Sequence, residues 1–306
     1  MESILKNVIQ KVSFNKVRVI ASIIILLATT IFLTKTLINY YGQIQHIIYS
    51  ISPIRVIVSF CFFLCYLYLR ALSWGHLIHF LGASINKADS LSVWFLSEAT
   101  RYIPGSIWSF VTRSYLAQQK NISRNISVLI SPVESIVAIT ATTILSLYAI
   151  LNSLKRIEIN VTFYILVTSS LILTFGLLLL HKPITRILKK LATQTLVSRA
   201  LVIALIYQSL AWSFYSLGYI YLIDTTRIDF ILFFSSALLA WLIGYLSIIT
   251  PMGLGVRESA FVLLTGPQIG TTEAALIAIL ARVILIVAEL SNLIFWTSKK
   301  RKSISV

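Results

Sequence analysis

The chain has 306 residues, of which 58% are hydrophobic and 12% are charged, and its mean hydropathy is +0.88. Soluble domains are roughly half apolar and a quarter charged, so this composition excludes an ordinary soluble protein and indicates a membrane protein. Two cysteines exclude a disulfide framework, and a formal net charge of +16 points to an acidic partner or an anionic surface.

Long apolar runs predict transmembrane helices. A run of about 20 apolar residues is long enough to cross a bilayer. Runs of this kind cover residues 17–38, 54–81, 126–151, 161–180, 201–223 and 274–296. No alternating strand pattern of useful length occurs, so the sequence predicts an all-α, polytopic membrane protein with about six full spans.

Two further apolar stretches, residues 91–116 and 230–264, are interrupted near their middle. The interrupting residues are Pro104 and Gly105 in the first stretch, and Pro251, Gly253 and Gly255 in the second. Proline removes a helical hydrogen bond and glycine loosens the backbone, so each interruption is expected to end a helix. We expect two re-entrant helical hairpins, because the part before the first break is short for a crossing. Eight full spans are the alternative.

The order of these elements repeats along the chain. Residues 17–151 read as span, span, hairpin and span, and residues 161–296 repeat that order from the opposite side of the membrane. Halves of opposite orientation form the inverted repeat of many secondary transporters, whose site lies near the midplane where discontinuous helices meet. We therefore predict one transmembrane domain, residues 1–306, that contains these two halves.

The basic residues predict the orientation. They gather before the first span, in residues 182–199, and in the tail at residues 299–302. By the positive-inside rule, both termini and the segment 182–199 are expected in the cytoplasm, with the chain in the cell membrane as a multi-pass protein. Most of the positive charge is then an orientation signal and an attraction to anionic lipid, which argues against nucleic acid as a partner.

Nine charged residues fall inside or at the edge of the apolar segments. An unpaired charge at the bilayer centre costs about 2.5–3.5 kcal/mol on insertion scales, so each must pair, face water or bind a ligand. Ion pairs that join helices and a polar cavity are the two interpretations; we favour the cavity, because both broken segments carry charges. The nine residues are Arg70, Glu98, Arg101, Arg113, Glu134, Arg257, Glu258, Arg282 and Glu289.

Spacing along a helix relates some of these charges. Glu98 and Arg101 are three residues apart, and Arg282 and Glu289 are seven apart, so each pair shares a helical face.

Three short motifs resemble those of one known family. They are RYIPGSIWSFVTR at residues 101–113, PVE at 132–134 and PMGLGVRE at 251–258. Together they resemble the transmembrane region of lysylphosphatidylglycerol synthases and their stand-alone, flippase-like relatives. Met252 stands where the family usually has glycine, but Gly253 and Gly255 preserve the helix break.

The resemblance implies movement of a lipid across the bilayer. The full synthases carry a soluble domain that transfers an amino acid from tRNA to a lipid headgroup. This chain ends at Val306, soon after the last span, so we expect it not to be an enzyme. It has no Walker A motif for ATP, and we expect no cofactor. The resemblance implies transport of a phospholipid or a polyprenyl-phosphate-linked sugar in cell-envelope biosynthesis.

The broken helices suit a phosphate headgroup. A helix that restarts after a break presents free backbone N–H groups and the positive end of its dipole, which bind phosphate. Arg113 and Arg257 follow the breaks and would add charge-assisted hydrogen bonds, while Glu134 and Glu258 would hold these arginines in the empty site. The predicted substrate-binding residues are Arg101, Arg113, Glu134, Arg257, Glu258, Arg282 and Glu289.

Other candidate residues carry weaker signals. Tyr102 and Trp108 offer aromatic faces to an acyl chain or a sugar, but interfacial aromatics are equally consistent with the pattern. His76 and His79 share a helical face without a cysteine or carboxylate nearby in sequence, so we expect packing there rather than a metal site.

Three functions therefore stay open at this stage. The first is the flippase-like transporter, and the second is a non-transporting membrane partner of a separate envelope lipid or glycan enzyme. The third is a membrane-embedded enzyme that acts on a lipid phosphate. A polar cavity that reaches the midplane favours the first, and a dry, tightly paired core favours the second.

Overall fold

A computed structural model of the chain describes residues 51–102, 107–156, 196–223, 228–247, 253 and 255–302. These residues form eight α-helices and one short 3₁₀ turn, and the described part contains no strand. The all-α prediction is confirmed. The spans predicted at residues 17–38 and 161–180 lie outside the described residues, as do the breaking residues Pro104, Gly105 and Pro251.

Four of the helices are long enough to cross a membrane. They are α4 (Pro53–Phe80), α7 (Arg124–Arg156), α10 (Leu196–Ile220) and α13 (Thr271–Lys302). Each contains an apolar stretch with few charged residues, and each coincides with a predicted span. The first begins with a proline at its start, where the missing N–H costs nothing and the fixed φ favours a helix. The chain is therefore a polytopic membrane protein.

The remaining helices are shorter and come in two pairs. The first pair is α5 (Lys87–Glu98), which continues into the turn η1 (Ala99–Tyr102), and α6 (Trp108–Gln118). The second pair is α11 (Phe230–Leu246) and α12 (Val256–Ile269). At about 1.5 Å per residue, the 12 residues of α5 extend about 18 Å, well short of a bilayer core of about 30 Å.

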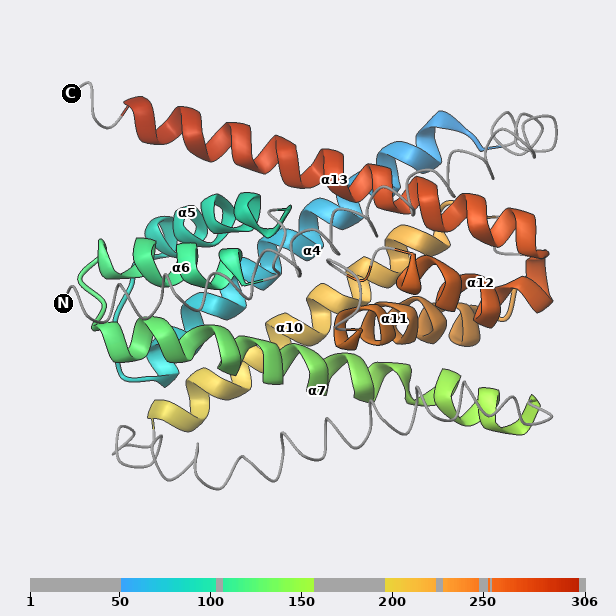
Figure 1. Ribbon diagram of the computed structural model, residues 1–306, viewed down its shortest axis with the longest axis horizontal. Helices are drawn as coiled ribbons and strands as arrows, with labels where there is room; N and C mark the ends of the chain where they lie inside the picture. The colour runs from blue at the N-terminus through green and yellow to red at the C-terminus, as the bar shows by residue number, and fades with distance from the viewer. Residues whose placement is uncertain are drawn as a thin grey trace, which may run out of the picture.

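The two pairs lie at opposite ends of the molecule (Figure 1). α5 and α6 lie where α4 ends and α7 begins, whereas α11 and α12 lie where α10 ends and α13 begins. Each pair thus lies at one end of the molecule. Whether the pairs are re-entrant hairpins or full spans stays a prediction. The order helix, hairpin, helix occurs twice in opposite directions, as an inverted repeat requires. The repeat boundaries 17–151 and 161–296 stay a prediction.

The helices α4 and α10 form the centre of the bundle, side by side (Figure 1). Ser59 Oγ donates to the carbonyl oxygen of Gly218 at 2.7 Å, and Ser73 Oγ donates to that of Ala204 at 2.9 Å. A side chain at Gly218 would meet the ring of Phe63 at 2.8 Å, so the glycine permits this close approach. Small residues and interhelical hydrogen bonds are what hold helices together in a membrane, where lipid is as apolar as the core.

Two glycines position the start of α12 against α11. Gly253 has a φ of +68°, and a Cβ there would meet the carbonyl oxygen of Gly244 at 2.4 Å. A Cβ at Gly244 would in turn meet Cβ of Arg257 at 2.7 Å. The broken segment therefore packs backbone to backbone on α11, which fixes where the first turn of α12 places its charged side chains.

We expect Gly244→Ala to lower the thermal stability of the protein in detergent. Overpacking a tight site costs about 1–3 kcal/mol, which outweighs the roughly 0.5–1 kcal/mol that alanine gains over glycine inside a helix. Gly266→Ala is the matched control, because a Cβ at this helical glycine meets its nearest atom, Thr271 Cγ2, at 3.3 Å. Equal unfolding temperatures for the two variants would contradict this account of the packing.

Candidate functional site

A buried group of three arginines and three glutamates lies around the first hairpin, and we call it the first ionic network. Its centre is Arg113 on α6, whose side chain is 1% exposed. The guanidinium makes ion pairs with Glu98 through Nη2 and with Glu134 through Nη1, and its Nε donates to Ser97 Oγ at 2.8 Å. The six members are Arg70, Glu98, Arg101, Arg113, Glu134 and Glu289.

Glu134, on α7, is held from α4 and α5 as well. Its Oε1 accepts from Arg70 Nη2 at 3.2 Å and from the Trp94 indole N–H at 3.1 Å. Arg70 Nη1 donates to the Tyr66 hydroxyl at 3.1 Å, and its guanidinium lies 5.5 Å from the ring centre of Trp212. The Glu134 carboxylate and its partners thus involve five helices: α4, α5, α6 and α7 from the first half and α10 from the second.

Arg101 connects this network to the other half of the molecule. Its Nη1 lies 2.9 Å from Glu98 Oε2 within the hairpin, and its Nη2 makes an ion pair with Glu289 on α13. Arg101 and Glu289 are far apart in sequence, so their ion pair is a tertiary contact between the first hairpin and the last helix.

The first ionic network is balanced in charge. Three arginines face three glutamates, so the formal charges cancel within the group. A buried ion pair offsets the large cost of desolvation only when its geometry is good and its remaining donors are satisfied, and Arg113 meets both conditions. Arg113 can thus hold α5, α6 and α7 together without a ligand.

A second group, the Arg257 cluster, lies in the other half and is not balanced. It consists of Arg257 and Glu258 in the first turn of α12 and Arg282 on α13. Arg257 is 5% exposed and Arg282 is 8% exposed. The three residues carry two positive charges and one negative charge, and Arg282 also interacts electrostatically with Arg101 and Glu289 of the first ionic network.

The hydrogen bonds of the Arg257 cluster are also incomplete. Arg257 Nε lies 3.7 Å from Glu258 Oε1, beyond hydrogen-bond distance, while Glu258 Oε2 accepts from the Gly255 backbone N–H at 2.8 Å. Within the described residues, Nε and Nη2 of Arg257 and Nε of Arg282 have no hydrogen-bond acceptor, and Glu258 Oε1 has no donor. In the first ionic network, Arg70 Nε is likewise without an acceptor among these residues. A buried donor without an acceptor costs about 1–3 kcal/mol, so the Arg257 cluster has the capacity to bind an anion.

Tyrosine rings contact both charged groups. Tyr66, which accepts from Arg70, packs on Tyr215 with ring centres 5.1 Å apart. Arg257 lies 6.0 Å from the ring centre of Tyr215. The hydroxyls of Tyr215 and Tyr219 lie 3.1 Å apart. Aromatic side chains of α4 and α10 thus connect the first ionic network to the Arg257 cluster.

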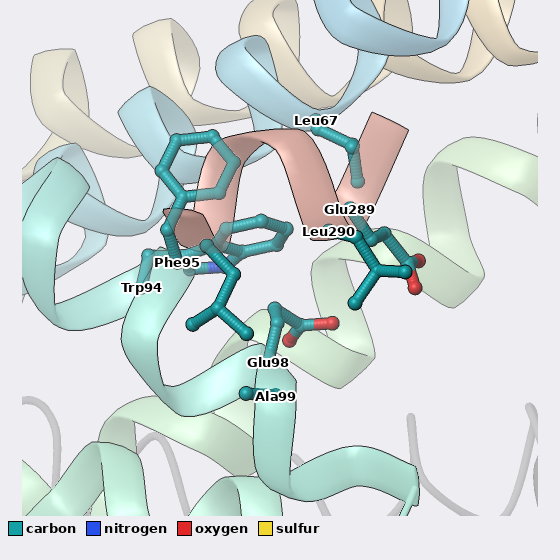
Figure 2. Close-up of a pocket in the computed structure, with 8 residues that line it drawn as sticks. Leu67, Trp94, Phe95, Glu98, Ala99, Glu289 and Leu290 are labelled. Atoms are coloured by element: carbon teal, nitrogen blue, oxygen red, sulfur yellow. The ribbon is translucent and has the colours of Figure 1, made fainter. Parts of the chain in front are cut away.

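A small pocket of about 60 Å³ opens beside the first ionic network (Figure 2). Glu98 and Glu289 line it from two different helices, and Trp94 and Phe95 form one wall. Leucines complete the lining, so the pocket is largely apolar with two acidic groups at one side. The leucines are Leu67, Leu290 and Leu293.

The structure confirms several sequence predictions and refines others. Glu98 pairs with Arg101 and Glu134 pairs with Arg113, as their spacing and motifs predicted. Glu289 shares α13 with Arg282, but its ion pair is with Arg101. The predicted substrate-binding residues thus fall into two groups with different chemistry. Whether any of them binds a substrate stays a prediction.

The aromatic and histidine candidates have different surroundings. Trp108 is 40% exposed at the start of α6, and the side chain of Tyr102 lies outside the description. His76 stacks on Tyr207, with ring centres 5.3 Å apart. In the described residues, His79 and its neighbours belong to no group of three metal-ligating side chains.

The sequence analysis did not predict the aromatic side chains that contact the first ionic network. Tyr66 and Arg70 are four residues apart on a helix, a spacing that predicts their contact, whereas Trp94 donates to Glu134 on another helix. Ser97 gave no comparable signal, because its partner Arg113 is on the other side of the helix break.

The four long apolar helices, the two pairs of shorter helices and the charges buried between them define a class: a helical, multi-pass membrane protein with a polar interior. The chain belongs to the family described as lysylphosphatidylglycerol synthase TM region, whose family model matches residues 18–288. The match covers most of the chain and concerns the transmembrane region of these synthases. No curated protein and no solved structure matches the chain.

We expect Arg113→Gln to destabilise the protein by about 3–5 kcal/mol, because removal of one partner leaves buried carboxylates uncompensated. Addition of Glu134→Gln should restore much of this loss, since the remaining charges of the network then cancel. Arg124→Gln, at an exposed arginine of α7, is the control and should stay within about 0.5 kcal/mol. Thermal unfolding in detergent measures all three variants, and an Arg113→Gln variant as stable as the control would refute the structural role of Arg113.

Proposed function

We propose that this chain is a flippase-like membrane transporter, which moves a phospholipid or a polyprenyl-phosphate-linked sugar across the bilayer in cell-envelope biosynthesis. Family membership supports a role in lipid handling within the envelope. The observation that carries the proposal is the Arg257 cluster, a buried site with excess positive charge and unused guanidinium donors. The proposed transporter is not an enzyme and uses no cofactor.

The two candidate substrates share a phosphate group, and the Arg257 cluster suits it. A phosphate would neutralise the excess charge and accept from Arg257 Nε and Nη2, in the planar arrangement that a guanidinium favours. The N-terminus of α12 adds the positive end of a helix dipole one residue away. Glu258 already accepts from Gly255 there, so part of this helix end is capped within the protein.

The sequence predicted a phosphate held by one arginine from each half, and the contacts distinguish the two. Arg113 donates to two carboxylates and a serine, so in this conformation these donors are not available to a phosphate. Arg257 has donors available in the described structure. We therefore place the phosphate at Arg257 and Arg282 and assign Arg113 to the support of the first hairpin.

The proposed setting is the cell membrane, with both termini in the cytoplasm. The basic residues near the ends of the predicted spans support this orientation through the positive-inside rule. An anionic lipid or a lipid-linked sugar is then the partner, and nucleic acid is not.

A non-transporting membrane partner of a separate envelope enzyme is the second candidate. The tight pairing of the first ionic network favours it, as does the small size of the adjacent pocket, because a dry and balanced core has no need of a substrate. The Arg257 cluster argues in the other direction, since its charge is not balanced within the described residues.

We expect Arg257→Gln to abolish transport and Arg257→Lys to impair it clearly, because lysine retains the charge but loses the planar fork. The double variant Arg257→Gln with Glu258→Gln should be well folded and still inactive. The glutamine that replaces Glu258 keeps a side-chain oxygen that can accept from the Gly255 backbone N–H, so the cap of α12 is preserved.

The assay is inward or outward movement of a phosphatidylglycerol with a fluorescent acyl chain in liposomes, read with a membrane-impermeant quencher. Thermal unfolding in detergent is measured alongside, with Arg124→Gln as the control. Full activity in the double variant would refute the phosphate site. Wild-type protein that moves no lipid above protein-free liposomes would instead support the non-transporting partner.

A further inference from the structure

The first hairpin meets α13 along a boundary that we call the seam. Within the described residues, the ion pair between Arg101 and Glu289 crosses it near the hairpin tip. Phe95 and Trp296 cross it further along, stacked with ring centres 6.3 Å apart and planes 13° from parallel. The seam thus joins the broken element of the first half to the last helix of the second half.

The pocket of Figure 2 lies in this seam. Phe95 and Glu98 line it from α5, and Glu289 and Leu290 line it from α13. Leu290 is also 48% exposed on the outer face of its helix, which is a membrane-crossing helix. The pocket therefore adjoins the surface that faces lipid, and its apolar wall matches an acyl chain.

The ion pairs on the two sides of Glu98 differ in how firmly they are held. Arg113 is 1% exposed and is fixed by partners on α5 and α7, whereas the side chain of Arg101 is 24% exposed. If Arg101 parts from Glu289, it keeps its pair with Glu98 inside the hairpin. Water that reaches a partly exposed pair lowers the cost of separating it, so the seam is the joint that opens with the least desolvation.

We propose that the seam is a lateral entrance for a membrane lipid, closed in this structure by the Arg101–Glu289 ion pair and the Phe95–Trp296 stack. The acyl chain of the lipid passes between α5 and α13, with Leu67, Leu290 and Leu293 as its apolar wall. This inference rests on the proposed transport function and adds the route by which the lipid enters. Irregular backbone such as η1 is tolerated at membrane depth only where protein or a polar cavity surrounds it, which agrees with a hairpin tip beside an entrance.

A reversible cross-link across the seam tests the proposal. The background is Cys61→Ala with Cys65→Ala, which removes the two native cysteines. Phe95→Cys with Trp296→Cys then places one thiol on each side, to be joined by a short bis-methanethiosulfonate linker. Ser73→Cys with Ala204→Cys is the control pair, since it joins α4 to α10 at a point where they are already in contact.

Transport of fluorescent phosphatidylglycerol in liposomes is the first readout. We expect the seam cross-link to reduce the rate by about tenfold or more, as when a required opening is blocked, and a reducing agent to restore it. The control cross-link should change the rate by less than about twofold. A seam cross-link that leaves the rate unchanged would overturn the proposal.

Labelling by a phosphatidylcholine with a photoreactive acyl chain is the second readout, and it does not require transport. Peptides that contain residues 91–99 and 289–293 should be labelled in the open, reduced protein. When the seam is cross-linked, their labelling should fall about tenfold. The Glu289→Gln variant should increase their labelling, because the ion pair across the seam is weakened. The exposed Ile206 of α10 gives the reference level of labelling by bulk lipid.

The two readouts separate the two claims. If labelling depends on the cross-link but no lipid is transported, the proposed function is refuted and the lateral entrance stands. If the protein transports lipid but the labelling of the pocket residues is the same with and without the cross-link and in Glu289→Gln, the entrance is refuted and the proposed function stands.

Discussion

The constraint on which this structure depends is that a charge inside a membrane protein must be compensated. At the bilayer centre, a single uncompensated charge costs about 2.5–3.5 kcal/mol on insertion scales, and the protein buries several. Arg113 shows how the cost is met: two carboxylates and a serine surround one guanidinium. Because those partners come from α5 and α7, compensation of Arg113 also determines where the first hairpin lies against its neighbouring span.

The same constraint is met differently in the second half. Arg257 follows its helix break much as Arg113 follows the first, but its nearest carboxylate also caps α12 and lies beyond hydrogen-bond distance of Arg257 Nε. The two halves therefore have similar layouts and different electrostatics. One holds a neutral network that stabilises a hairpin, and the other holds a cluster that an added phosphate would complete. Tyr66 and Tyr215 connect the two groups by contacts that join Arg70 to Arg257.

The sequence predicted the architecture well because its signals are local. Apolar run length determines which helices can cross a membrane, and proline and glycine determine where a helix ends, so the four long helices and the second break followed directly. The Glu98–Arg101 pair was equally accessible, since three residues of helix bring the side chains together. The Arg101–Glu289 pair was not, because residues 188 positions apart meet only through the packing of α13 on the first hairpin. The difference between Arg113 and Arg257 was hidden for the same reason: it depends on Ser97 and on the tight packing of Gly244, neither of which a motif records.

The most direct test of this account measures where an anionic lipid binds. Native mass spectrometry gives the Kd of phosphatidylglycerol for the detergent-solubilised protein, for an Arg282→Gln variant and for a variant with both Arg113→Gln and Glu134→Gln. The account predicts that Arg282→Gln weakens binding by about tenfold or more, while the double variant, whose network stays neutral, remains within about threefold of wild type. Binding that is lost in the double variant and retained in Arg282→Gln would contradict it.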